Sequence, residues 1–101
     1  MIYHVLTKSS WEKALIQGFY EAPSLVVEGF IHLSKHEQVP GVLKRYYQGQ
    51  TDLVLLNIDE KKLIAPLKFE FSPSVKENFP HLYGSLNLDA VVSVSAVVNY
   101  L

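Results

Sequence analysis

The chain has 101 residues, of which 49% are hydrophobic, and this fits a single domain over residues 1–101 with a core of modest size. Nine basic residues against ten acidic ones give a net charge of -1, which argues against a broad phosphate-binding surface and therefore against a nucleic-acid partner, although a small nucleotide remains compatible. The absence of cysteine excludes disulfides, thiolate catalysis and zinc sites that use cysteine.

The first third of the chain predicts a strand, a helix and a loop. Ile2–Thr7 is apolar and β-branched, which is typical of a strand. Ser9 and Glu12 have the spacing of a capping box, which predicts a helix that begins there and ends near Gly18. Phe19–Glu28 predicts a loop with a short helical turn. The predicted buried face of the helix consists of Trp11, Ala14 and Leu15.

A second strand and helix follow. Residues 28–34 predict a strand that is entered through a glycine. Ser34 and Glu37 repeat the capping-box spacing and predict a helix that runs to about Gln48. Pro40 lies inside this stretch and removes one helical hydrogen bond, so we expect it to bend the first turns.

The second half of the chain consists mainly of predicted strands. Leu53–Ile58 is nearly all apolar and predicts a strand covered on both faces, followed by a turn over Asp59–Ala65. Leu67–Phe71 alternates and predicts another strand, Ser72–Pro80 predicts a polar loop, and Val91–Val98 predicts the last strand. With both main helices in the N-terminal half, this order predicts an α+β fold with a small mixed, mainly antiparallel sheet.

Three of the four histidines occur in apolar motifs. His4 lies in YHVLT, His32 in GFIHLS and His81 in FPHLYG, whereas His36 lies in a polar helical turn and is expected to be exposed. Burying an imidazole is costly unless its nitrogens find partners. Each ring therefore either bonds to nearby backbone as an ordinary core histidine or lines a shared polar pocket. We predict the shared pocket.

Zinc and a strand carboxylate are the other chemical possibilities. Zinc can be bound by three imidazoles, but these spacings match no ligand signature, so no metal is expected. Glu70 alternates with the apolar residues of its strand and is either a site carboxylate or an ordinary solvated side chain.

The sequence resembles the bacterial family catalogued as domain of unknown function 952, over almost the whole chain. The blocks that carry the resemblance are Tyr3-His4, Trp11-Glu12, Gly29-Phe30-Ile31-His32-x-Ser34, Gln38-Val39, Gly49-Gln50-x-Asp52-Leu53-Val54-Leu55-Leu56-x-Ile58-Asp59, Glu70, and Phe79-Pro80-His81-Leu82-Tyr83-Gly84-x-Leu86. This family in turn looks like a distant member of the ADP-ribosyltransferase superfamily, because the strand Tyr-His-x-x-Thr and the segment His-Leu-Ser resemble the start of RNA 2′-phosphotransferases.

The resemblance implies a sheet split into two half-sheets and NAD as the cofactor. It implies that His4 hydrogen-bonds the NAD ribose and that His32 and Ser34 lie beside the nicotinamide ribose. It also implies that Glu70 takes the late acidic position of the superfamily. The residues that are expected to be catalytic are His4, His32 and Glu70. Those that are expected to bind the ligand are Thr7, Ser34, His81 and Tyr83.

Three functions remain open. The first is an NAD- or ADP-ribose-directed enzyme, the second a non-catalytic module for a nucleotide-like ligand, and the third a histidine-based hydrolase with or without a metal. Arg45 is the only arginine, which weakens a 2′-phosphotransferase function in particular. We found neither a signal-peptide pattern nor an apolar run of the roughly 20 residues that span a bilayer, so a cytoplasmic monomer or weak homodimer without a membrane partner is expected.

Overall fold

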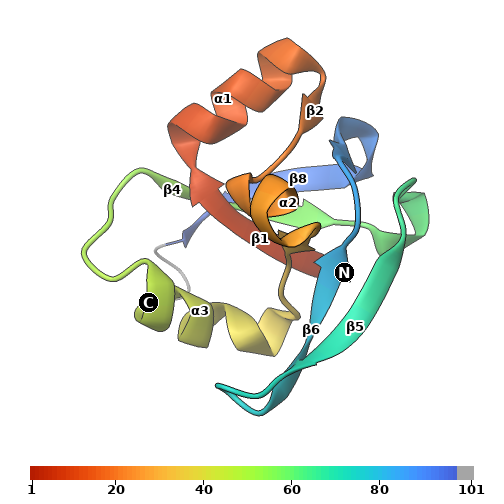
Figure 1. Cartoon of the computed structure of the whole chain (residues 1–101). Coiled ribbons are helices and arrows are strands. Elements are labelled where there is room, and N and C mark those ends of the chain that lie inside the picture. The colour runs from red at the N-terminus through yellow and green to blue at the C-terminus, as the bar shows by residue number, and fades with distance from the viewer. Residues whose placement is uncertain (98–101) are drawn as a thin grey trace.

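The computed structural model describes residues 1–97, in which the three α-helices lie among the first strands and the later strands follow without a further α-helix (Figure 1). The helices are α1 (Lys8–Gln17), α2 (Pro23–Glu28) and α3 (Val39–Tyr46). The strands are β1 (Ile2–Thr7), β2 (Phe19–Tyr20), β3 (Ile31–His32), β4 (Leu53–Ile58), β5 (Leu67–Ser72), β6 (Glu77–Leu82), β7 (Leu86–Asn87) and β8 (Val91–Ala96). The predicted α+β class is confirmed, and the strand pairs within these residues are antiparallel.

Two three-stranded sheets form the frame of the molecule. One has the strand order β1-β4-β8 and the other β3-β6-β5, while β2 and β7 form a separate two-stranded pair. A seam joins the two larger sheets: the Tyr3 N–H donates to the Ser34 carbonyl and the Ser34 N–H donates to the Tyr3 carbonyl, each at 2.8 Å. The seam therefore fixes the edge strand β1 next to the chain that leaves β3.

Strand β4 is covered on both faces, as predicted from its apolar sequence. Leu55 and Leu56 are adjacent, so their side chains point to opposite faces of the sheet, and both are fully buried. Leu56 packs into the larger core cluster, which also contains residues of β3, β6 and β7. Leu55 packs under α3 in a smaller cluster. The members of this smaller cluster are Val5, Val39, Leu43, Leu53, Leu55 and Val97.

Helix α1 begins earlier than the capping-box prediction, which is wrong in its detail. Thr7 is the N-cap, because its Oγ1 accepts the Ser10 N–H at 3.1 Å. Gly18 ends the helix as predicted, with a left-handed φ of 93°. Ala14 is buried, but Leu15 is 55% exposed. Successive residues of an α-helix are rotated by about 100° around its axis, so Leu15 faces solvent although the preceding Ala14 is buried.

Several boundaries differ in the segment between α1 and α3. The predicted strand over residues 28–34 shortens to Ile31–His32, because Glu28 still belongs to α2. Ser34 is part of the seam and caps no helix; instead, Gln38 Oε1 accepts the Lys35 N–H at 2.9 Å at the start of a 3-10 turn. Pro40 lies in the first turn of α3, where a missing N–H costs no helical hydrogen bond, so the predicted loss of one is wrong.

The polar loop predicted over Ser72–Pro80 is wrong, because β6 already begins at Glu77. Pro80 misled the prediction, since proline is rare in a central strand. The Pro80 carbonyl accepts the Leu33 N–H at 3.0 Å. In an antiparallel pair the N–H and C=O of a residue face the same neighbour, so the missing N–H faces the side where β3 has already ended. The turn over residues 59–65 and the strands β5 and β8 are confirmed, although Val98 lies outside the described residues.

Gly84 sits where no side chain fits. Its φ is 155°, and a Cβ built there would lie 2.7 Å from the Cβ of Ala65. We expect Gly84→Ala to lower the free energy of unfolding by about 1–3 kcal/mol, as overpacking does, measured by urea denaturation. Adding Ala65→Gly removes the opposing methyl and should restore part of the loss. A double variant that is no more stable than Gly84→Ala would show that the contact is not the cause.

Candidate functional site

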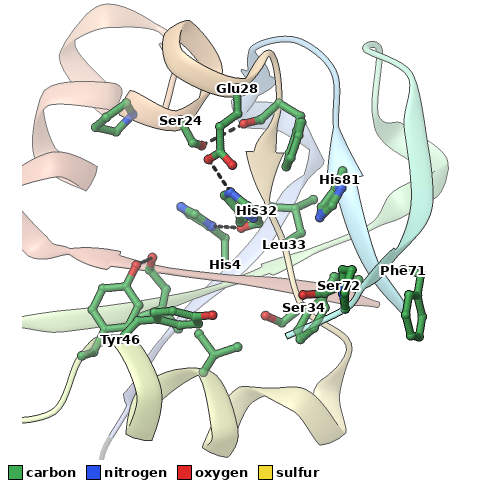
Figure 2. A pocket seen from close by; sticks show the side chains of 17 residues that line it. His4, Ser24, Glu28, His32, Leu33, Ser34, Tyr46, Phe71, Ser72 and His81 are labelled. Carbon is green, nitrogen blue, oxygen red and sulfur yellow. Dashed lines mark hydrogen bonds and ion pairs between the residues drawn. The ribbon is translucent and has the colours of Figure 1, made fainter. Parts of the chain in front are cut away.

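A pocket of about 560 Å³ lies between the two larger sheets, with α2 and α3 at its sides (Figure 2). The first sheet contributes His4 and the second contributes His32 and His81, so histidines from separate parts of the chain meet around one cavity. The full lining consists of His4, Val5, Pro23, Ser24, Glu28, Phe30, His32, Leu33, Ser34, Val42, Tyr46, Tyr47, Phe71, Ser72, Pro73, Phe79 and His81.

His4 is a buried imidazole with both nitrogens occupied. It is only 7% exposed. Its Nδ1 lies 2.7 Å from the His32 carbonyl, which can only accept, so Nδ1 carries the proton. Its Nε2 then accepts the hydroxyl of Tyr20 at 3.0 Å. Burial lowers the pKa of His4 to about 4 and raises the pKa of Tyr20 to about 12, so both groups are neutral at physiological pH.

His32 is held from the other side by a carboxylate. Its Nε2 lies 2.7 Å from Glu28 Oε2, at the end of α2. Because the carboxylate accepts, Nε2 carries the proton, and Nδ1 is the acceptor of the neutral ring. The side chain of His32 is 52% exposed, so its ring is available to a ligand. The backbone carbonyl of the same residue accepts the hydrogen bond from His4, which couples the two histidines.

His81 belongs to a three-membered cluster. Its Nδ1 lies 2.8 Å from Glu70 Oε1, and the Tyr83 hydroxyl donates to the same oxygen at 2.5 Å. These two donors stabilise the carboxylate: the Tyr83 hydroxyl first and then His81 lower the pKa of Glu70. The pKa of Tyr83 is raised by the same bond. Glu70 is absent from the pocket lining and reaches it only through His81.

Phe30 holds the rings of the site together. It stacks on His81 with ring centroids 4.0 Å apart and an angle of 18°, and it meets His32 edge-on at 4.8 Å. The rings of His32 and His81 are 5.3 Å apart. Their closeness follows from register, since His32 and His81 are paired across β3 and β6 and so point to one face of the sheet.

The structure brings together most of the predicted site residues. His4, His32, Ser34 and His81 line the pocket, and Glu70 and Tyr83 lie behind His81. Thr7 is elsewhere: its side chain caps α1. His36 is exposed, as predicted, and its ring lies 5.5 Å from that of Tyr3.

Three contributors were missed from the sequence: Tyr20, Glu28 and Phe30. Glu28 and Phe30 lie four and two residues before His32. This spacing indicates contact with His32 only if Glu28 is known to end a helix and Phe30 to precede a strand, which the sequence does not show. Tyr20 lies in a strand too short to show periodicity.

The lining is poor in positive charge. None of the residues that line the pocket, within the described range, is a lysine or an arginine. Lys68 is nearby, paired with His81 across β5 and β6 and with its Nζ 4.8 Å from the centroid of the Tyr83 ring. Residues 1–97 contain no group of three or more His, Asp or Glu side chains placed to hold a metal ion. Nor, over the same residues, is any helix long and apolar enough to cross a membrane.

Fold and site together define a small α+β protein with two antiparallel half-sheets and a histidine-lined pocket between them. More particularly, the chain belongs to the family described as "Protein of unknown function (DUF952)", whose model matches residues 5–94. A search of curated proteins gave no match.

Solved structures of one protein, CC0527 from Caulobacter crescentus, are similar to this chain. Its crystal structure is 36% identical with a TM-score of 0.85, covering 93% of this chain and 82% of that one. A crystal structure of its double mutant is 35% identical with a TM-score of 0.84, covering 93% of this chain and 82% of that one. Its solution NMR structure is 32% identical with a TM-score of 0.80, covering 99% and 95% of the two chains.

Proposed function

We propose that the pocket binds NAD or an ADP-ribose-type molecule as substrate and that the protein is an ADP-ribosyltransferase-like enzyme. The observation that carries the proposal is the meeting of His4, His32 and His81, from both half-sheets, around one cavity of about 560 Å³. That volume is in the range of pockets that bind small ligands. It also agrees with the resemblance of the Tyr-His-x-x-Thr and His-Leu-Ser segments to the superfamily.

The lining suits the uncharged and aromatic parts of such a substrate. Tyr46 and Phe79 offer aromatic rings on which nicotinamide or adenine can stack. His32 and Ser34 offer polar groups to ribose hydroxyls. Because no lysine or arginine among the described residues lines the pocket, the diphosphate is expected at its solvent side, nearer Lys68.

Cleavage of the nicotinamide–ribose bond passes through a state with oxocarbenium character. A protein accelerates such a step mainly by fixing the ribose and by stabilising the positive charge as it develops. Glu28 lines the pocket beside His32 and supplies a negative charge on that side. His4 acts only indirectly in this scheme, because it orients the His32 backbone and has no free ring nitrogen.

Thermal-shift measurements with NAD, ADP-ribose and nicotinamide test the proposal. A ligand at a hundredfold excess over its dissociation constant stabilises the folded state by about 2.7 kcal/mol, which is readily seen as a higher melting temperature. We expect shifts with NAD and ADP-ribose, their loss in His32→Ala, and nicotinamide release from NAD. His36→Ala is the matched control, because His36 is exposed and absent from the pocket lining.

The outcomes separate the candidate functions. No shift with any of the three compounds would contradict the proposal. A shift without nicotinamide release would instead favour a non-catalytic binding module, which the occupied nitrogens of His4 also support.

A further inference from the structure

We propose that His81 is the general base that takes the proton from the acceptor, a water or a hydroxyl group, and that Glu70 and Tyr83 are positioning residues for it. This inference rests on the proposed function and specifies which side chain activates the nucleophile. It reverses the expectation from the resemblance, in which Glu70 itself acts at the reaction centre.

The ring of His81 is fixed in place and in tautomer. Glu70 Oε1 accepts the Nδ1–H at 2.8 Å, which leaves the lone pair on Nε2. Phe30 stacks on the ring of His81 with the two centroids 4.0 Å apart, which stabilises this ring orientation. The acceptor side of the imidazole is therefore set before any ligand arrives, which is the arrangement that efficient proton transfer requires.

The second ring nitrogen of His81 is unpartnered and accessible. Nε2 of His81 has no hydrogen-bond partner within residues 1–97. Every fully buried side-chain nitrogen or oxygen in this range does have a partner. It follows that Nε2 is accessible, although His81 as a whole is only 9% exposed. His81 is one of the residues that line the cavity, so a ligand bound there would lie beside its ring.

Glu70 is poorly suited to be the base itself. It is not part of the pocket lining, and Oε1 already accepts two hydrogen bonds, from His81 and Tyr83. Those bonds stabilise its ionised form and so weaken it as a proton acceptor. The same bonds make it a firm anchor for the Nδ1–H of His81.

One base is sufficient for the chemistry. The ribose C1′–nitrogen bond breaks with its electron pair going to the cationic pyridine ring, so nicotinamide leaves as a neutral molecule and needs no proton. The acceptor oxygen forms the new bond to C1′, and its proton passes to Nε2 of His81 and then to solvent. The second carboxylate-bound histidine, His32, is thus free to hold the ribose, with its ring 5.3 Å from that of His81.

Glu70→Gln is the decisive variant. The amide of the introduced glutamine can donate to Nδ1, which moves the ring proton to Nε2 and removes the base. We expect kcat for nicotinamide release to fall on the order of 100-fold or more, with little change in KM for NAD. Long-range ¹H–¹⁵N NMR should show a proton on Nδ1 of His81 in the wild type and on Nε2 in Glu70→Gln. Glu60→Gln, at an exposed site, is the charge-matched control.

Two further variants complete the test. Tyr83→Phe removes one hydrogen bond from Glu70 and leaves the His81 contact, so we expect a smaller loss and an unchanged tautomer. His81→Gln removes the base itself, so kcat should fall at least as far as in Glu70→Gln. A wild type that releases nicotinamide while Glu70→Gln keeps its kcat and its pH profile would overturn this inference alone. A wild type that neither binds nor cleaves NAD overturns the proposed function and this inference with it.

Discussion

Lowering the pH from 7 to 4 is expected to reduce the free energy of unfolding by about 3 kcal/mol through His4 alone, given a shift of one pKa unit per 1.36 kcal/mol. The pKa of this imidazole falls from 6.5 to about 4 on folding, chiefly because burial disfavours its charged form. Between those two values the unfolded chain binds a proton that the folded chain does not. Stability contributed by His4 is therefore complete above about pH 6.5 and falls as the solution is acidified.

Urea unfolding of the wild type and of His4→Gln at a series of pH values from 7 to 4 measures this effect. Glutamine keeps a donor for the His32 carbonyl but does not titrate, so the stability gap between the two proteins should narrow as the pH falls. Glu70 does not interfere in most of this window, because its pKa is lowered and its contribution is lost only at more acidic pH. Parallel pH profiles for the two proteins would contradict the prediction.

Leu43→Ala is expected to lower the free energy of unfolding by about 3 kcal/mol, in the range found for buried leucines. Leu43 and Val39 are the buried residues of α3, and with Leu55 of β4 they belong to the smaller core cluster. Alanine is an excellent helix former, so the loss would come from the cavity and not from helix propensity. Chemical denaturation measures it.

The same substitution should affect the pocket. Helix α3 also contributes Val42 and Tyr46 to the lining, so a loosened helix should show faster amide hydrogen exchange and a smaller thermal shift with NAD. Lys44→Ala is the matched control, because Lys44 is the next residue of the same helix and is exposed; it should change stability by no more than about 0.5 kcal/mol. Equal effects of the two substitutions would show that α3 is not anchored through Leu43.

The longer apolar elements of the fold could be predicted from the sequence. The β1, β4 and β8 segments are long enough for their apolar and β-branched composition to indicate a strand. The two-residue strands β2 and β7 are not, since a period of two needs more positions than they have. Pro80 hid β6, because nothing local reveals that its missing N–H would face the side on which β3 has already ended.

The sequence predicted which residues form the site better than it predicted the contacts between them. Histidines within apolar motifs indicated a pocket, and His4, His32 and His81 do line one. The register that pairs His32 with His81 depends on strand β6, which the prediction lacked. The roles within the site depend on atoms: only the structure shows that both nitrogens of His4 are occupied and that Glu70 lies behind His81.

The seam at Tyr3 and Ser34 joins the two sheets along the edge strand β1. His4 lies in the first sheet, next to the seam, and His32 and His81 lie together in the second sheet. The hydrogen bond from His4 Nδ1 to the His32 carbonyl ties the two sheets together again beside the seam, while strand register sets the spacing of His32 and His81. The relative positions of all three rings are therefore set by contacts within the protein, before any ligand enters the pocket.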